Sequence, residues 1–267
     1  MNHLDELENK SIYIIREAFH RFDNMALLWS LGKDSTTLLW LTRKAFLGQI
    51  PFPCVHIDTT YKFPEMYRFR QEYAEKWGLN LLVHINHEAI EKGVSYDTHD
   101  AFTCCTELKT NGLKQAIAKH NYDALLVGIR RDEHGIRAKE RVFSPRDQNF
   151  QWNYEDQPAE LWDQYMSREE EDQHSRVHPL LGWTEVDIWR YIQRENIPTS
   201  ELYFAKDGKR YRSLGCMPIT KPVDSDADTI EKIIAEIETS DETERSGRAQ
   251  DKEDADTMQK LRALGYM

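Results

Sequence analysis

The chain has 267 residues, with 40% hydrophobic and 30% charged side chains and a formal net charge of −11. This composition is typical of a soluble globular protein, and the negative charge argues against unspecific binding to nucleic acid or anionic membranes. No run approaches the roughly 20 apolar residues of a membrane helix, and residues 1–10 are polar and acidic, unlike a signal peptide. We therefore expect a cytoplasmic protein whose four cysteines are free thiols.

The first half of the chain predicts helices that alternate with short apolar strands. The expected helices cover residues 4–22, 36–46, 64–77 and 106–119, and the expected strands cover residues 25–30, 54–57, 79–85 and 124–128. This alternation predicts an α/β fold, with a doubly wound, mostly parallel sheet and helices on both faces. Because such folds bind ligands beyond the carboxyl ends of their strands, residues 30–35, 58–60 and 128–131 should meet at one edge of the sheet.

The pattern becomes less regular in the second half of the chain. The expected elements are a long surface loop over 144–172, a helix over 184–195, a basic and turn-rich segment over 202–216 and a helix over 229–238. We therefore divide the chain into an α/β domain over residues 1–200 and a C-terminal region over residues 201–267. The C-terminal region is expected to close on the site or on a partner.

A loop between the first expected strand and the following helix has the composition of a polyphosphate-binding site. Backbone N–H groups at a helix start attract anions, Gly32 permits close approach of the backbone, and Lys33 offsets phosphate charge. The loop is not a Walker motif, because Lys33 is followed by Asp34. We predict that ATP is bound by Ser30, Leu31, Gly32, Lys33, Asp34, Ser35 and Thr36. The alternative is an ordinary turn between a strand and a helix.

A dense basic segment follows the fourth expected strand and begins after Gly128. Its cations are Arg130, Arg131, Arg137, Lys139 and Arg141. Arginine binds tetrahedral oxyanions through paired donors, so this segment is a candidate for phosphate or substrate binding. The alternative is a solvated charged face.

Two further positions are candidates for nucleotide binding. Asp58 ends the second expected strand, where it either contacts the adenine, the ribose or a magnesium-bound water, or only closes a turn. Arg248 follows Gly247 near the C-terminus, and we expect it to close over the phosphates together with Arg210, Arg212 and Arg245.

The order Ser-x-Gly-x-Asp-Ser in residues 30–35 resembles the pyrophosphate-binding loop of the ATP pyrophosphatase superfamily, whose members cleave ATP between the α- and β-phosphates. Nearly the whole chain is similar to the small, ATP-binding subunit of heterodimeric sulfate adenylyltransferase, within the phosphoadenosine-phosphosulfate reductase family. Segments that carry the resemblance include 42–46, 56–59, 130–133, 137–141, 183–189 and 214–216.

The resemblance implies an adenine nucleotide alpha hydrolase-like fold and the use of ATP and Mg²⁺. It also implies adenylyl transfer to sulfate with release of pyrophosphate, and a GTPase large subunit as partner. Because sulfate is a poor nucleophile, catalysis would rest on positioning and charge neutralisation rather than on a base. The candidate catalytic residues are therefore Lys33, Asp34, Arg130, Arg131 and Arg137.

Sulfate activation needs no thiol, so it does not explain why the chain contains these cysteines. Cys104 and Cys105 open an expected helix, whose N-terminus would lower thiol pKa values, and Cys216 follows a basic turn. The related sulfonucleotide reductases hold an iron–sulfur cluster through four cysteines. Here Ile219 stands in the fourth position, so a cluster would need Cys54.

Several alternatives therefore stay open at the level of the sequence. The thiols are small buried hydrophobes, ligands of an iron–sulfur cluster in a sulfonucleotide reductase-like protein, or redox or sulfur-carrying groups at Cys104, Cys105 and Cys216. Sulfur carriers would indicate an ATP pyrophosphatase of DNA phosphorothioation or RNA thiolation, with a cysteine desulfurase as partner and nucleic acid as substrate. A non-enzymatic nucleotide-binding scaffold and a homo-oligomer are further alternatives. The ten histidines lack metal-ligand spacing, and we predict no metal site formed by protein side chains alone.

Overall fold

The structure is a computed structural model that describes residues 2–133, 135–147, 149–153, 155, 157, 159–161, 164–165, 174–240 and 244. Six strands form one sheet in the order β3-β2-β1-β4-β8-β5, in which β5 is antiparallel to β8 and the other pairs are parallel. The strands are β1 (Met25–Leu28), β2 (Cys54–Ile57), β3 (Leu81–His84), β4 (Ala124–Leu126), β5 (Phe143–Arg146) and β8 (His174–Val177). The prediction of a mostly parallel sheet is confirmed.

Helices connect most of these strands. They are α1 (His3–Arg21), α2 (Lys33–Ala45), α3 (Pro64–Lys76), α4 (His87–Glu91), α5 (Ala101–Cys104), the π-helix η1 (Cys105–Asn111), α6 (Gly112–His120), α7 (Glu185–Glu195) and α8 (Ile230–Thr239). Short elements complete the chain: the 3-10 helices η2 (Gly135–Lys139), η3 (Glu201–Tyr203) and η4 (Met217–Ile219), and the strand pairs β6–β7 (Glu160–Leu161, Gln164–Tyr165) and β9–β10 (Lys209–Arg210, Val223–Asp224).

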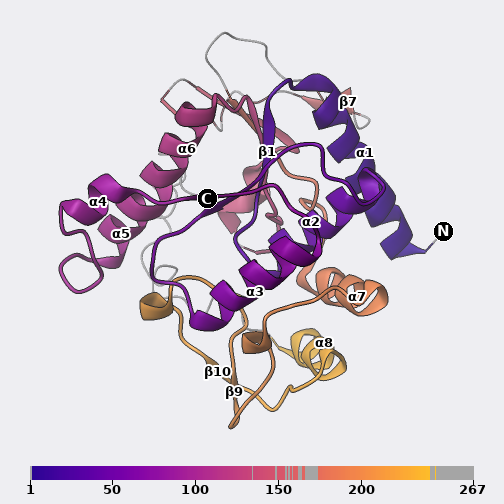
Figure 1. The fold of residues 1–267 in the computed structure, drawn as a ribbon. Coiled ribbons are helices and arrows are strands. Elements are labelled where there is room, and N and C mark those ends of the chain that lie inside the picture. Colours follow the sequence, from indigo (N-terminus) through magenta and orange to yellow (C-terminus); the bar gives the residue numbers. More distant parts are fainter. Residues whose placement is uncertain are drawn as a thin grey trace.

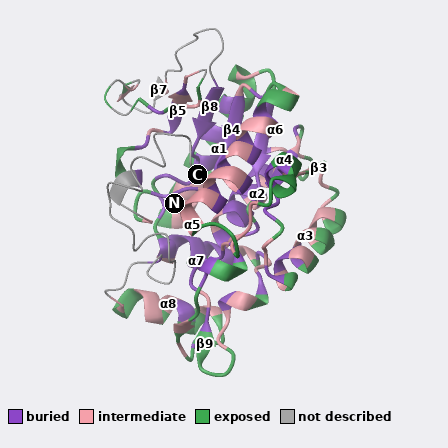
Figure 2. Cartoon of the chain, turned by 90° about the vertical axis from the view of Figure 1, so that its left-hand side faces the viewer, coloured by how far each residue is buried: buried purple, intermediate pink, exposed green. Residues whose placement is uncertain are grey.

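The helices lie on both faces of the sheet, as the alternating pattern predicts. In Figure 1, α1 and α2 lie to the right of β1, whereas α6 lies to its left. α1 packs against α2, which in turn contacts α7. Figure 2 shows the strands as the most completely buried elements, and all residues of β1, β2, β4 and β8 are buried. Burial on both faces is typical of parallel strands.

Local sequence signals explain the ends of the regular helices. Asn2 and Asp5 form a capping box at the start of α1, and Thr184 and Asp187 form another at the start of α7. These reciprocal hydrogen bonds satisfy N–H groups that have no partner within the helix. The helix expected over 106–119 is present but is divided into η1 and α6.

The prediction of a long surface loop over 144–172 is wrong at β5 and at the short pair β6–β7, and β8 was not expected as a strand. β5 and β8 carry polar side chains that are nevertheless buried, such as Arg146, His174 and Arg176. Arg146 is satisfied by an ion pair of 3.0 Å with Glu140, which is also buried. A search for apolar runs misses such strands, because several of their buried side chains are polar.

The C-terminal region packs back onto the α/β sheet domain. α8 contacts α7, and the buried Tyr203 packs against Trp189 of α7 with ring centroids 5.3 Å apart. The described part of the chain contains no helix both long and apolar enough to cross a lipid bilayer. The boundary near residue 200 stays a prediction.

Candidate active site

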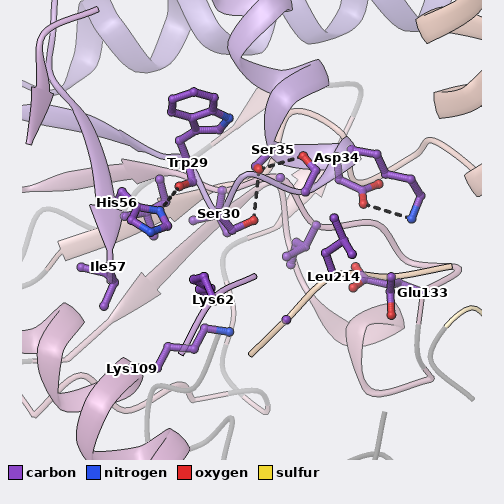
Figure 3. Close-up of a pocket in the computed structure, with 18 of the residues that line it drawn as sticks. Trp29, Ser30, Asp34, Ser35, His56, Ile57, Lys62, Lys109, Glu133 and Leu214 are labelled. Carbon is purple, nitrogen blue, oxygen red and sulfur yellow. Dashed lines mark hydrogen bonds and ion pairs between the residues drawn. The ribbon is translucent and has the colours of Figure 1, made fainter. Parts of the chain in front are cut away.

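A pocket opens at the carboxyl ends of β1, β2 and β4, where the parallel sheet was expected to bind a ligand. Trp29 and Ser30 line it after β1, His56 and Ile57 line it at the end of β2, and Gly128 lines it after β4. Residues 213–215 and Tyr203 contribute from the C-terminal region. Leu214 is labelled among the lining residues in Figure 3. The fold therefore brings segments that lie far apart in the sequence into one cavity.

The loop before α2 has a backbone held by hydrogen bonds. The Ser30 hydroxyl donates to Ser35 Oγ at 3.0 Å, and the Ser35 hydroxyl contacts the Gly32 carbonyl at 3.1 Å. The Lys33 N–H donates to the Tyr203 hydroxyl at 2.9 Å, so a tyrosine from the C-terminal region satisfies the first residue of α2. Leu31 has φ +69°, a left-handed conformation that costs a branched residue about 1–2 kcal/mol. The loop is thus a fixed, mildly strained structure at a helix start.

Gly128 lets the end of β4 approach this loop closely. A Cβ at residue 128 would lie 3.1 Å from the backbone carbonyl group of Asp34 and from Cα of Ser35. These are backbone atoms, which cannot rotate away as a flexible side chain would. Glycine is therefore favoured where the fourth strand meets the start of α2.

Two buried cations converge beside the loop. Lys33 is 1% exposed and Arg130 is 0% exposed, and both bind the carboxylate of Glu244. Lys33 also lies 3.5 Å from a carboxylate oxygen of Asp34, and Arg130 pairs with the same aspartate through its other oxygen. Glu185 lies 3.7 Å from the Lys33 ammonium. The two cations thus share two carboxylates, Glu244 and Asp34, and Glu185 lies close to Lys33.

The pKa values in this cluster reflect mutual charge stabilisation. Burial alone would raise the pKa of Glu244, but Arg130 and Lys33 outweigh it and hold that pKa well below its usual range. Burial would lower the pKa of Arg130, and Glu244, Asp132 and Glu185 raise it instead. The Glu244 carboxylate and the Arg130 guanidinium are therefore both charged at neutral pH, so the site holds buried opposite charges in direct contact.

Of the remaining predicted site residues, some line the pocket and others do not. Arg137 and Glu133 line the pocket as an ion pair. Arg131 is exposed and lines a separate cavity beside Trp183, so the structure does not bring it into this pocket. Asp58 accepts hydrogen bonds from Tyr67 at 3.0 Å and Arg70 at 2.8 Å and does not line the cavity.

The other residues predicted to bind the nucleotide do not line the described pocket or lie outside the described residues. Leu31 and Thr36 are buried and do not line the pocket, and Thr36 accepts a hydrogen bond from the Trp29 indole N–H at 3.1 Å. Arg248 lies outside the described residues, as do Arg245 and Gly247. Arg210 forms an ion pair with Glu236 at 2.5 Å, and Arg212 forms one with Glu185 at 2.9 Å.

The opposite wall of the pocket holds His56, Lys62 and Lys109 (Figure 3). His56 Nδ1 donates to the Trp29 carbonyl at 2.8 Å, and burial together with the charge of Lys62 lowers the pKa of His56 to about 4. The imidazole is therefore neutral at physiological pH. Lys62 Nζ lies 3.9 Å from Cys216 Sγ, just behind this wall.

All four cysteines are free and buried, but they do not share one site. Cys105 and Cys216 belong to a small apolar cluster, in which Cys105 Sγ lies 3.4 Å from the Tyr96 hydroxyl. Cys54 belongs to the main core instead, so the described residues do not assemble the four-thiolate site that would need it. The described residues also hold no group of three or more His, Cys, Asp and Glu side chains able to bind a metal ion.

The expectation of a lowered pKa at the cysteine pair is wrong for Cys104. Burial raises the pKa of Cys104, which sits at the end of α5 and continues into η1 rather than opening a helix. Cys216 shows the opposite direction. Burial would raise the pKa of Cys216, but Lys62, Thr59 and Tyr96 outweigh it and lower the pKa.

Comparison with known proteins assigns the family of this chain and the class of its fold. Residues 24–222 match the phosphoadenosine phosphosulfate reductase domain family. The fold is similar to the phosphoadenylyl-sulfate reductase of Candida auris in a phosphate complex, with TM-score 0.55, 17% identity and coverage of 81% of this chain and 95% of that chain. It is also similar to Candida glabrata FMN adenylyltransferase in complex with ATP, with TM-score 0.57, 20% identity and coverage of 82% and 63%.

Curated relatives narrow the assignment. "Sulfate adenylyltransferase subunit 2" of Bacteroides fragilis is 43% identical, and the alignment covers 100% of this chain and 98% of that protein. The protein of the same name from Geobacter metallireducens is 42% identical with the same coverage. The chain therefore belongs to the phosphoadenosine phosphosulfate reductase domain family and, within it, to the sulfate adenylyltransferase subunit 2 proteins.

Proposed function

We propose that this protein binds ATP and transfers its adenylyl group to sulfate, releasing pyrophosphate. The observation that carries this proposal is the convergence of Lys33 and Arg130 on one carboxylate at the start of α2. Two buried cations that share an anion at a helix N-terminus form a site suited to a polyphosphate. The relatives' shared name supplies the acceptor, sulfate.

In the proposed reaction a sulfate oxygen attacks the α-phosphorus of ATP. The new bond joins the sulfate oxygen to the α-phosphorus and completes an S–O–P bridge. The bond between the α-phosphorus and the oxygen that bridges it to the β-phosphorus breaks, and pyrophosphate leaves. Sulfate is a dianion at neutral pH and has no proton to lose, so no general base is needed. Lys33 and Arg130 would offset the charge that develops on the leaving pyrophosphate, and a rigid loop would hold it in line.

Mg²⁺ would accompany the nucleotide. A magnesium ion in such sites is typically held by one or two carboxylates together with phosphate oxygens, and it supplies charge neutralisation of the phosphates. Asp34 and Glu133 are carboxylates that line the pocket, so they are the side chains that would hold the ion, although each now pairs with an arginine. Asp34 would also position Arg130, which it binds directly.

We further propose that the protein acts with a large subunit that hydrolyses GTP. The relatives are named as a second subunit, which implies a partner. Sulfate activation is thermodynamically uphill, so coupling to GTP hydrolysis would draw it forward. The relatives' name favours sulfate over DNA or RNA thiolation, for which a cysteine desulfurase would be the partner.

The test is pyrophosphate release by the protein co-purified with its large subunit, with and without sulfate. We expect release to depend on sulfate, and Lys33→Met to lower its rate about 100-fold, as the loss of a preorganised charge does in other enzymes. Absence of sulfate dependence in the complete complex would contradict the proposed reaction. A non-enzymatic scaffold would predict that Lys33→Met changes only the affinity for ATP.

A further inference from the structure

A second basic region lies in the pocket, apart from the pyrophosphate loop. Lys62 follows β2 and Lys109 belongs to η1, and both line the same cavity as Lys33. In Figure 3 the labelled Lys62 and Lys109 lie at the lower left, whereas Asp34 and Glu133 lie on the right. The pocket therefore has two cationic ends, contributed from opposite sides of β1 in the sheet order.

The two ends differ in how their charge is balanced. Lys33, Arg130 and Arg137 each bind at least one carboxylate. Lys62 forms no ion pair with any carboxylate in the described parts of the chain, and its ammonium lies 3.9 Å from the thiol of Cys216. A lysine that faces a ligand pocket without a carboxylate partner is a site for an anion.

The turn that carries Lys62 is held in place from several directions. Asp58 accepts hydrogen bonds from the Thr60 N–H at 2.8 Å and from Arg70 at 2.8 Å. The Lys62 N–H donates to the Tyr67 hydroxyl at 3.4 Å, and that hydroxyl donates to Asp58 at 3.0 Å. Asp58 thus fixes the turn rather than the nucleotide, and the ammonium of Lys62 projects from a rigid base.

The surroundings of the Lys62 ammonium are polar rather than acidic. The Thr59 hydroxyl lies 3.1 Å from Cys216 Sγ, and the Tyr96 hydroxyl also contacts that thiol. The Met217 N–H donates to the Tyr61 carbonyl at 2.7 Å, which ties the loop of Cys216 to the turn of Lys62. Of these residues Lys62 alone lines the pocket, so an anion at this end would meet its ammonium.

The geometry of phosphoryl transfer decides which anion this end would receive. The attacking and leaving oxygens lie roughly in line through the phosphorus. The pyrophosphate end is defined by Lys33 and Arg130, so the attacking group must arrive from the other end of the pocket. We propose that Lys62 binds the incoming sulfate and orients it toward the α-phosphorus, an inference that rests on the proposed adenylyl transfer to sulfate.

The experiment compares Lys62→Met and Lys62→Arg in the protein co-purified with its large subunit, with sodium sulfate and ATP varied separately. We expect Lys62→Met to raise the KM for sulfate about 10- to 100-fold, the effect of losing one charge-assisted hydrogen bond. The KM for ATP should stay within about twofold, and Lys62→Arg should restore much of the sulfate affinity because it keeps the charge. Lys92→Met, at an exposed lysine outside this pocket, is the matched control.

Two results would overturn the role of Lys62. One is an unchanged KM for sulfate in Lys62→Met, and the other is an equal rise in the KM for ATP, which would place Lys62 on the nucleotide. Thermal unfolding of each variant checks that a changed KM does not come from a damaged fold. If the wild-type complex itself releases pyrophosphate without sulfate, the proposed function fails first, and the two failures are thereby distinguished.

Discussion

Gly128→Ala tests whether contact between β4 and the pyrophosphate loop sets the position of that loop. The added methyl group would lie 3.1 Å from three backbone atoms of residues 34 and 35, whereas ordinary contacts start at 3.4 Å. The start of α2 or the end of β4 must therefore move by a few tenths of an ångström. Overpacking of this kind costs about 1–3 kcal/mol of the free energy of unfolding.

Both stability and activity should respond to Gly128→Ala. A loss of about 1–3 kcal/mol corresponds to a melting temperature lowered by roughly 2 to 12 °C for a domain of this size. Because the displaced segment holds Lys33 and Asp34, the kcat/KM for ATP should fall about 10-fold or more, since small misplacements of reacting groups are costly. Calorimetry and sulfate-dependent pyrophosphate release measure the two effects on the same preparations.

The matched control is Gly182→Ala. A Cβ at residue 182 would meet no atom within 4 Å, and its backbone conformation needs no glycine. This variant should keep the wild-type melting temperature within about 2 °C and the wild-type activity, since exposed substitutions change stability by about 0.5 kcal/mol or less. Wild-type activity in Gly128→Ala, or an equal loss in Gly182→Ala, would refute the steric explanation.

Three further variants probe the charges and the hydroxyl around the site. Glu244→Gln removes the carboxylate that Lys33 and Arg130 share, so inorganic pyrophosphate should bind several-fold more tightly in titration calorimetry; unchanged or weaker binding would contradict competition between Glu244 and phosphate. Tyr203→Phe removes the acceptor of the Lys33 N–H and should raise the KM for ATP by up to about 10-fold, whereas an unchanged KM would show that the loop needs no such support. Glu140→Gln leaves the buried Arg146 without its carboxylate and should lower the free energy of unfolding by about 3–5 kcal/mol in urea. A variant as stable as the wild type would show that the fold does not need this ion pair.

The Glu140 carboxyl also gives a pH dependence of stability. Burial would raise its pKa, but Arg146, His178 and Ser144 outweigh it and lower the pKa from 4.5 to about 2. A lowered native pKa stabilises the fold above the unfolded value, and this contribution, about 3 kcal/mol, is lost as the pH falls from about 4.5 toward 2. Urea unfolding at several acidic pH values should show a weaker pH dependence in Glu140→Gln than in the wild type; equal dependences would assign acid sensitivity to other carboxyls.

The sequence was most informative where apolar periodicity and burial agree. β1, β2 and β4 are apolar and fully buried, so their carboxyl ends and the loop at 30–35 could be placed from the pattern alone. β5 and β8 could not, because Arg146 and Arg176 are buried in polar environments that no hydrophobic pattern records.

The site was predicted incompletely for a related reason. Composition pointed to Lys33, Asp34 and Arg130, which stand next to recognisable strand ends. Tyr203 and Glu244 reach the same place from the C-terminal region, through contacts separated by 170 and 211 residues. The spacing of neighbouring residues cannot predict these contacts, because they depend on how the C-terminal region folds back over the sheet.

The separation of Glu244 from Lys33 has a consequence for how the protein is made. During synthesis the residues that match the family, 24–222, emerge before Glu244. Asp34, Asp132 and Glu185 belong to that part of the chain and pair with Lys33 and Arg130, so the two cations have carboxylate partners before Glu244 is made. Glu244 then adds a bridge between the two cations, so the pocket reaches its final arrangement of charges only when the C-terminal region has been synthesised.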